Sequence, residues 1–248
     1  MNATSMISPK VRNIPPSGIR KYFDMINEME NVISLGVGEP DFVTPWNIRE
    51  AGIYSLEKGY THYTPNSGYF ELRDEISKYI YRNFNVKYNP ENEVLVTVGG
   101  SEAIDLALRA LINNGDEVII PEPSFVAYKA CAIFAGATPV IVNLKSKDGF
   151  RLTPDILEKA ITPRTKILIL SYPNNPTGAI MKQEDLAGIS EILKDKDIII
   201  LSDEIYAELT YNRKHVSLAS FPGMKEKTIL INGFSKAFAM TGWRLGYA

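Results

Sequence analysis

The sequence predicts an α/β fold: a large three-layer domain with a mostly parallel seven-stranded sheet, and part of a small domain at the N-terminus. Three observations favour this class. Short β-rich runs and helical segments alternate from about residue 90 onward, as in sheets whose strands are joined by helices. Runs such as KILIL and DIIIL are apolar throughout, which a parallel sheet covered on both faces requires. The 248 residues are enough for a substantial core.

The strands are predicted from β-branched and aliphatic runs of strand length. Seven such runs lie at 93–98, 117–121, 138–143, 166–170, 197–201, 228–232 and 244–248. The helices are predicted from apolar residues that recur at helical spacing. These segments are 46–58, 69–84, 102–113, 153–161 and 182–193. Asn114 and Gly115 supply a stop signal after 102–113, and Thr153 and Pro154 suit the N-cap and first turn of 153–161.

The N-terminal segment differs from the rest of the chain. It is rich in turn-forming residues, as in IPPSG and GVGEPDF, and lacks a clear alternation of strand and helix. We therefore expect residues 1–45 to form an N-terminal arm and a piece of the smaller domain. Residues 46–248 are expected to form the large domain.

Composition argues against several classes of protein. The net charge of −2 gives no electrostatic reason to expect nucleic acid or an anionic membrane as a partner. The single cysteine, Cys131, cannot form an internal disulfide, and its apolar neighbours ACAIFAG favour a buried structural thiol. His62 and His215 have no ligand-spaced partners, so no metal site is expected. The N-terminus lacks a secretory signal core, and no apolar run is long enough to span a bilayer. We expect a soluble, cytoplasmic protein.

The segment LVTVGGSEAIDLAL predicts a strand, a Gly-Gly-Ser turn and a helix. Glycines allow a ligand close to the backbone, and the N–H groups at a helix start favour an anion such as phosphate. Ser101 could equally be an ordinary N-cap on a tight turn. The segment is neither a P-loop nor a dinucleotide fingerprint, because no Gly-Lys-Ser/Thr follows and G-x-G-x-x-G is absent.

Polar residues follow two of the most apolar predicted strands. Asp203 comes at the end of DIIILSD, and SYPNNPTG comes after KILIL. Open α/β sheets bind their ligands at the carboxyl ends of their strands, and a buried Asp203 would require a cationic partner. Each segment also has a structural interpretation, since Asp caps helices and Asn-Asn-Pro-Thr-Gly is favourable turn chemistry.

Lys236 lies in the loop between the last two predicted strands, among the apolar residues Phe234, Ala237, Phe238 and Met240. Desolvation there would lower the pKa of the amine, which is how proteins prepare a lysine for Schiff-base chemistry. The alternative is a lysine that extends its amine to solvent.

A phosphate cradle, an aspartate, an Asn-Pro turn and an apolar-flanked lysine together match what pyridoxal phosphate requires. The sequence resembles the class I/II aminotransferases, the aspartate-aminotransferase-like enzymes that depend on pyridoxal 5'-phosphate. The resemblance runs from IPPSGIRKYFD to the last residue. It is carried by SYPNNPTG, SDEIY and GFSKAFAMTGWRLGY, which are diagnostic together.

The resemblance implies four catalytic residues. Lys236 would form the internal aldimine with the cofactor and move the α-proton of the substrate. Asp203 would bind the pyridine nitrogen and keep it protonated. Asn175 and Tyr206 would donate hydrogen bonds to the phenolic oxygen of the ring.

The same resemblance implies how the phosphate is held. Its partners would be Gly100, Ser101 and Glu102 through backbone N–H groups, together with Ser235 and Arg244. An arginine suits phosphate because its guanidinium can donate two parallel hydrogen bonds.

Three further positions complete the site that the resemblance implies. Phe125, in PEPSFVAY, would stack on the ring of the cofactor. Tyr63, in THYTPNSG, would reach the phosphate of a neighbouring subunit, which implies a homodimer with shared active sites. Gly38 and Asn175 would contact the substrate carboxylate.

The implied activity is transamination between an amino acid and a 2-oxo acid. Two alternatives stay open: a β-lyase on the same scaffold, and a non-catalytic cofactor-binding module. Family members continue beyond RLGY into further helices and a C-terminal small domain that carries the arginine for the substrate carboxylate. We therefore expect a truncated N-terminal portion with little or no turnover alone. The amino donor, aspartate-like or aromatic, is not resolved by these residues.

Overall fold

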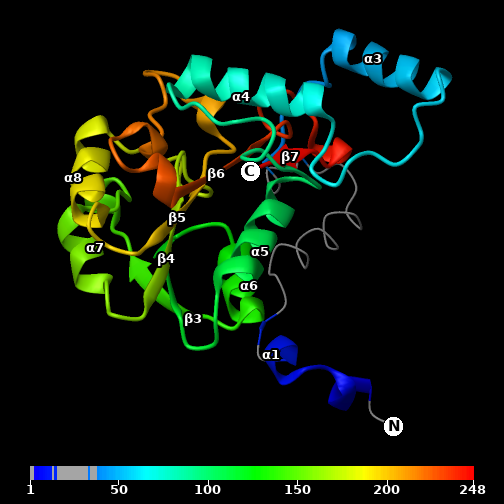
Figure 1. Ribbon diagram of the computed structural model, residues 1–248. Coiled ribbons are helices and arrows are strands. Elements are labelled where there is room, and N and C mark those ends of the chain that lie inside the picture. Colours follow the sequence, from blue (N-terminus) through cyan, green and yellow to red (C-terminus); the bar gives the residue numbers. More distant parts are fainter. Residues whose placement is uncertain (1–2, 13, 16–32, 34–37) are drawn as a thin grey trace. The chain divides into compact units, whose positions relative to one another are not determined.

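A computed structural model describes residues 3–12, 14–15, 33 and 38–248 (Figure 1). The chain divides into two compact units, Met1–Asp41 and Phe42–Ala248. The described part of the first unit holds a short 3-10 helix, Ala3–Met6, and the single-turn helix α1, Pro9–Arg12. The predicted arm and small-domain piece over residues 1–45 stay a prediction, because residues 16–32 and 34–37 lie outside the described part.

The second unit is built on a seven-stranded sheet, as predicted. The order across the sheet is β1-β7-β6-β5-β4-β2-β3. The strands are β1 (Val96–Thr97), β2 (Glu117–Glu122), β3 (Thr138–Asn143), β4 (Thr165–Ser171), β5 (Ile199–Asp203), β6 (Thr228–Gly233) and β7 (Gly246–Tyr247). The first and last strands are shorter than predicted, with two residues each.

The sheet is mostly parallel, which confirms the prediction from its apolar strands. All neighbouring pairs from β6 to β3 are parallel, and β7 alone runs antiparallel to both of its neighbours, β1 and β6. The carboxyl ends of β1, β4, β5 and β6 therefore lie at one edge of the sheet.

Six α-helices are described in this unit. They are α3 (Trp46–Glu57), α4 (Phe70–Phe84), α5 (Gly100–Leu111), α6 (Ala127–Ala135), α7 (Pro154–Ala160) and α8 (Gln183–Leu193). Sequence reasoning predicted five of them and missed α6. The segment AYKACAIFA is apolar on nearly all sides, so it lacks the helical periodicity on which those predictions rest. None of the described helices is long and apolar enough to cross a membrane.

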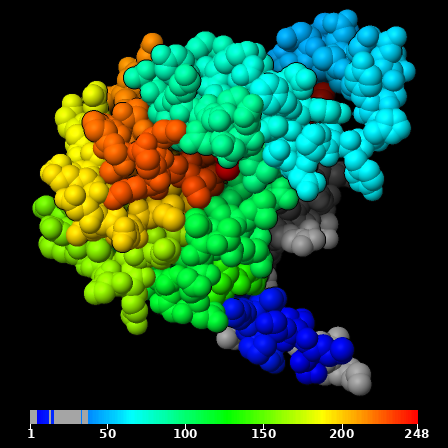
Figure 2. Space-filling view, viewed as in Figure 1, coloured from blue at the N-terminus to red at the C-terminus, as the bar shows by residue number. Residues whose placement is uncertain are grey.

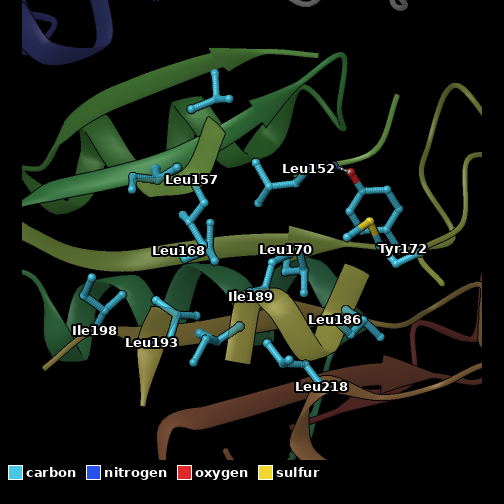
Figure 3. Packing of buried hydrophobic residues seen from close by; sticks show 14 of the residues in the cluster. Leu152, Leu157, Leu168, Leu170, Tyr172, Leu186, Ile189, Leu193, Ile198 and Leu218 are labelled. Atoms are coloured by element: carbon cyan, nitrogen blue, oxygen red, sulfur yellow. Dashed lines mark hydrogen bonds between the residues drawn. The ribbon is translucent and has the colours of Figure 1, made fainter. Parts of the chain in front are cut away.

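The strands bury opposite side chains on the two faces of the sheet. Val118, Ile167 and Leu201 belong to one cluster with residues of α5 and α6. On the other face, the neighbouring Ile119, Leu168 and Ile200 join a second cluster with residues of α7 and α8 (Figure 3). Successive strand residues point to opposite faces, so this division shows a sheet covered on both sides (Figure 1). The predicted three-layer architecture is therefore confirmed.

A third apolar cluster lies between α4 and the β6–β7 end of the sheet. Ile76, Ile80 and Phe84 from α4 contact Leu230 of β6 and Tyr247 of β7. By contrast, α3 has no buried residue, and Figure 2 shows it with the loop that follows it on the surface.

The β7 strand approaches the start of α5 unusually closely. A Cβ atom on Gly246 would lie 2.5 Å from the carbonyl carbon of Gly99, and heavy atoms do not pack at that distance. Gly99 itself has a φ of 80°, a conformation that glycine adopts at little cost. Glycine is therefore needed at Gly99 for the backbone shape of the turn and at Gly246 for the close approach of β7.

Candidate active site

Four loops that follow β1, β4, β5 and β6 meet at the carboxyl edge of the sheet. The first leads into α5 at Gly100, the others carry Asn175, Tyr206 and Lys236 respectively, and Asp203 is the last residue of β5. Ser171, Asp203 and Ile231 are paired neighbours across β4, β5 and β6. Residues that are far apart in the sequence are thus placed side by side by the parallel register.

The Asp203 carboxylate is buried below this edge. The Tyr128 hydroxyl lies 2.6 Å from Asp203 Oδ2 and 2.9 Å from Ser171 Oγ. A hydroxyl has one proton, so we assign Tyr128 as the donor to Asp203 and Ser171 as the donor to Tyr128. The backbone N–H of Ile205 also donates to Asp203 Oδ1, at 3.2 Å. Both donors to the carboxylate are neutral.

Burial raises the pKa of Asp203 above its ordinary value, and the charge of Glu204 adds to this effect. The hydrogen bonds from Tyr128 and Ile205 act in the opposite direction. A carboxylate in this position favours a ligand that brings a positive charge or a strong hydrogen-bond donor.

Tyr128 was missed by sequence reasoning, although it lies three residues after the predicted Phe125. Its ring packs edge to face against Phe125, with centroids 5.6 Å apart, and α6 holds it under the sheet edge. The signal that could have found it is the position of a tyrosine one helical turn beyond the stacking residue. Because α6 was not predicted, the three-residue spacing could not be recognised as one turn of a helix.

Asn175, Tyr206 and Lys236 form a group beside Asp203. Asn175 Nδ2 donates to the Tyr206 hydroxyl at 3.5 Å, a long hydrogen bond. The Lys236 amine lies 5.6 Å from the centroid of the Tyr206 ring, within the range of a cation–π interaction. Burial raises the pKa of Tyr206, and the charge of Asp203 raises it further. The structure thus brings these four predicted residues together.

The loop that carries Lys236 is held in a tight turn. The N–H of Met240 donates to the Ser235 carbonyl at 3.1 Å, and the N–H of Phe238 donates to the Phe234 carbonyl at 3.2 Å. The Thr44 hydroxyl donates to the Ala239 carbonyl at 2.6 Å. Ser235 and Lys236 are half-buried within this turn.

The start of α5 and Arg244 form the second part of the site. A Cβ atom on Gly99 would lie 2.4 Å from Arg244 Nη2, so the guanidinium lies directly against the turn. Arg244 Nη1 donates to the Thr241 carbonyl at 2.8 Å. A helix start offers N–H groups that no residue of the helix accepts, and the arginine adds a full positive charge beside them.

Glu102 has partners within the chain that limit its predicted role. Its N–H donates to the Gly99 carbonyl at 3.2 Å, and its carboxylate accepts from the Val98 N–H. Gly100 and Ser101, in the first turn of α5, remain the better placed anion donors.

Two predicted residues, Tyr63 and Gly38, are not part of this group. Tyr63 is 107% exposed in the loop between α3 and α4. Gly38 belongs to the first compact unit, so it stays a prediction. Tyr63 also stays a prediction, because its proposed role lies in a second subunit.

No cluster of three or more His, Cys, Asp and Glu side chains suited to a metal ion occurs within the described ranges. Cys131 is half-buried on α6 rather than fully buried as predicted. Burial raises the pKa of its thiol, as does the nearby Asp105, so little of it is in the nucleophilic thiolate form.

Comparison with known proteins gives consistent matches. The family described as "Aminotransferase class I and II" matches residues 30–248. A putative aminotransferase of Bacillus subtilis, YugH, is 56% identical over 99% of this chain and 64% of its own length. An aspartate aminotransferase of Pyrococcus abyssi is 46% identical over 97% of this chain and 62% of its own length. The chain thus spans less than two thirds of the length of these relatives.

A solved structure supports the same relationship. The aspartate aminotransferase of Thermus thermophilus with maleate superimposes with a TM-score of 0.92 at 38% identity. The match covers 97% of this chain and 63% of the Thermus chain.

The buried Asp203 carboxylate predicts a stability effect that depends on pH. Because its pKa is raised on folding, Asp203 contributes stability at pH values below its unfolded pKa, and this contribution is lost as the pH rises through the folded value. Asp203→Asn removes the buried charge, so near neutral pH we expect the chain without cofactor to melt roughly 2–4 °C higher, which is about 1 kcal/mol at this size.

Thermal melting followed by circular dichroism between about pH 3 and pH 8 would measure this difference. It should shrink toward acid pH. Asp197→Asn, at an exposed position just before β5, is the matched control and should not change the melting temperature. A lower melting temperature for Asp203→Asn at neutral pH would contradict the assignment of an uncompensated buried charge.

Proposed function

The chain belongs to the class I and II aminotransferase family, and we propose that it binds pyridoxal 5'-phosphate and serves the transfer of an amino group from an amino acid to a 2-oxo acid. One observation carries the proposal. Asp203, Asn175, Tyr206 and Lys236 lie together at the carboxyl edge of the sheet, and Arg244 lies against the start of α5 in the same unit.

The residues fit the three polar parts of pyridoxal phosphate. The first turn of α5 and the guanidinium of Arg244 would hold the phosphate. Asp203 would accept a hydrogen bond from the ring nitrogen, which offsets the cost of burying its charge. Asn175 and Tyr206 would donate to the phenolic oxygen. Phe125 packs against Tyr128, and its proposed role is to cover one face of the ring.

When bound, pyridoxal phosphate supplies an aldehyde that reacts with amines and a ring that withdraws electrons. The chain's own contribution is to position and to move protons. The Asp203 carboxylate would keep the proton on the ring nitrogen, and Tyr128 holds that carboxylate by its hydrogen bond. The Lys236 amine would serve as the base that accepts the proton of the substrate α-carbon.

Orientation sets the reaction that follows. Removal of the substrate α-hydrogen would depend on how the substrate is oriented, and a fixed substrate carboxylate would set that orientation. We propose Asn175 as a contact for that carboxylate, while the role of Gly38 stays a prediction from the resemblance. The relatives act on different amino donors by their names, so the donor is proposed only as an amino acid of the aspartate-like or aromatic class.

We propose a homodimer with shared active sites. The helix α3 has no buried residue. Its large exposed side chains include Trp46, Ile53, Tyr54 and Leu56. Large exposed apolar side chains are common at protein interfaces. Tyr63 follows in the next loop and would reach the partner's phosphate from there.

The proposed function is tested most directly at Lys236. The purified 248-residue chain is mixed with pyridoxal phosphate and reduced with borohydride, and the labelled peptide is identified by mass spectrometry. We expect one pyridoxyl group on Lys236. Lys236→Ala should remove it, whereas the control Lys182→Ala, before α8, should leave it in place. Labels scattered over many exposed lysines would contradict the proposed site.

Gly99 offers a test of the phosphate-binding part alone. Gly99→Ala places a Cβ against the Arg244 guanidinium at a positive φ, so we expect the affinity for pyridoxal phosphate to fall about tenfold or more, equivalent to about 1.4 kcal/mol. Equilibrium titration by absorbance measures this. Gly115→Ala is the control, because Gly115 also has a positive φ but nothing lies within 4 Å of its Cβ position. Equal losses in both variants would argue against a phosphate site at Arg244.

The dimer is tested by sedimentation velocity over a range of protein concentrations. Leu56→Lys places a charge on the exposed apolar side of α3 and should shift the chain toward monomer. Glu184→Lys introduces the same residue at an exposed position on α8 and should not. A monomeric wild-type chain at all concentrations would contradict the homodimer.

A further inference from the structure

A second carboxylate, Glu204, lies directly behind Asp203. Successive residues at the end of β5 point to opposite faces, so Asp203 faces Tyr128 and Glu204 faces the α4 side. Glu204 is only 1% exposed. Two adjacent buried carboxylates repel each other and each is costly to desolvate, so the second requires an explanation that the site described above does not give.

Three donors satisfy Glu204. The hydroxyls of Ser202 and Ser217 donate to Oε1 at 2.8 and 2.7 Å. His215 Nε2 lies 2.7 Å from Oε2. In the arrangement in which Glu204 accepts from all three, the imidazole donates from Nε2. Glu204 therefore joins the 3-10 segment near residue 217 to the end of β5.

These contacts also fix the turn that carries Tyr206. The N–H of Glu204 donates to the Ile231 carbonyl of β6 at 2.8 Å, and the Glu204 carbonyl accepts from the Ala207 N–H at 2.9 Å. The backbone of residues 203–207 is thereby held on both sides of Tyr206. A displaced Glu204 would shift both Asp203 and Tyr206.

Among the residues described, His215 is the basic side chain that contacts Glu204. The Phe84 ring of α4 packs edge-on against the imidazole, with centroids 5.4 Å apart. Burial raises the pKa values of Tyr79, Tyr88 and Tyr247, and the charge of Glu204 raises them further, so these three hydroxyls are neutral. Three further groups are exposed or bonded elsewhere: Arg213 and Lys214 in the flanking loop, and Glu208, which bonds Tyr79.

The pair lies within reach of water. The His215 side chain is 11% exposed. A cavity of about 20 Å³ lined by Ser202, Glu204 and His215 has room for about one water molecule.

We propose that Glu204 and His215 are a positioning pair for Asp203, in which the charge of His215 offsets the negative charge that Glu204 places behind that carboxylate. With His215 neutral, Glu204 draws the proton shared with a ring nitrogen toward Asp203. With His215 protonated, that bias is cancelled and the proton stays on the ring nitrogen. The cofactor part of this inference rests on the proposed function; the coupling to Asp203 does not.

The first test follows Asp203 in the chain without added cofactor, by carbon-13 NMR of labelled aspartate carboxyls from about pH 3 to pH 8. Asp203→Asn identifies the signal. Glu204→Gln should lower the pKa of Asp203 by about half a unit or more, because a neighbouring like charge is removed. His215→Gln keeps an N–H donor but cannot be protonated, so it should raise that pKa.

Lys214→Gln is the matched control, because it removes an exposed cation one residue from His215 and should leave Asp203 unchanged. Thermal melting confirms that each variant is folded, and His215→Gln alone decides the outcome if Glu204→Gln does not fold. If Asp203 has the same pKa in wild type and in every folded variant, the proposed coupling of Glu204 and His215 to Asp203 is wrong.

The second test uses pyridoxal phosphate labelled with nitrogen-15 in the ring, whose chemical shift reports whether the ring nitrogen is protonated. Relative to wild type, we expect more protonated nitrogen in Glu204→Gln and less in His215→Gln at the acid end of the range. Equal shifts in all forms would overturn the cofactor part. If wild type does not bind the labelled pyridoxal phosphate while the pKa of Asp203 still changes in the variants, the proposed function is wrong and the coupling to Asp203 is supported.

Discussion

The burial of the Asp203 carboxylate constrains the rest of the site. A buried negative charge with only neutral hydrogen-bond donors is costly, and its donors here are the Tyr128 hydroxyl and the Ile205 N–H. A cationic group that binds Asp203 would offset this cost, which would add to its binding free energy. Such local destabilisation is common where proteins bind or catalyse.

The parallel sheet determines which residues can surround Asp203. Because β1, β4, β5 and β6 all end at one edge, the loops that follow them meet there although they are up to about 140 residues apart in the chain. The antiparallel β7 then returns to this edge with Arg244 at its start. Its close approach to the Gly-Gly turn requires glycine at Gly246 and places the arginine against the helix start. One side of the site suits an anion. The other side suits a cation at Asp203 and also carries the Lys236 amine.

The sequence allowed most of the fold to be predicted, because apolar strands and amphipathic helices have clear periodicities. The apolar segment of α6 lacks that periodicity, so the helix and its Tyr128 were missed together. Asp203, Asn175, Tyr206 and Lys236 could be predicted because each lies in a motif at a strand end. The Glu204–His215 contact could not, since it depends on how an irregular loop packs against β5. Likewise, the neighbours of Glu102 follow from the exact turn geometry, which propensities do not determine.

The central claim is that Asp203 and the start of α5 hold opposite ends of one cofactor. A crystal structure of the chain grown with pyridoxal phosphate tests it most directly. The account predicts the phosphate at the first turn of α5 beside Arg244, the ring nitrogen within hydrogen-bond distance of Asp203, and the aldehyde carbon at Lys236. Pyridoxal phosphate bound elsewhere on the chain, or bound with Asp203 still paired only to Tyr128 and Ile205, would contradict it.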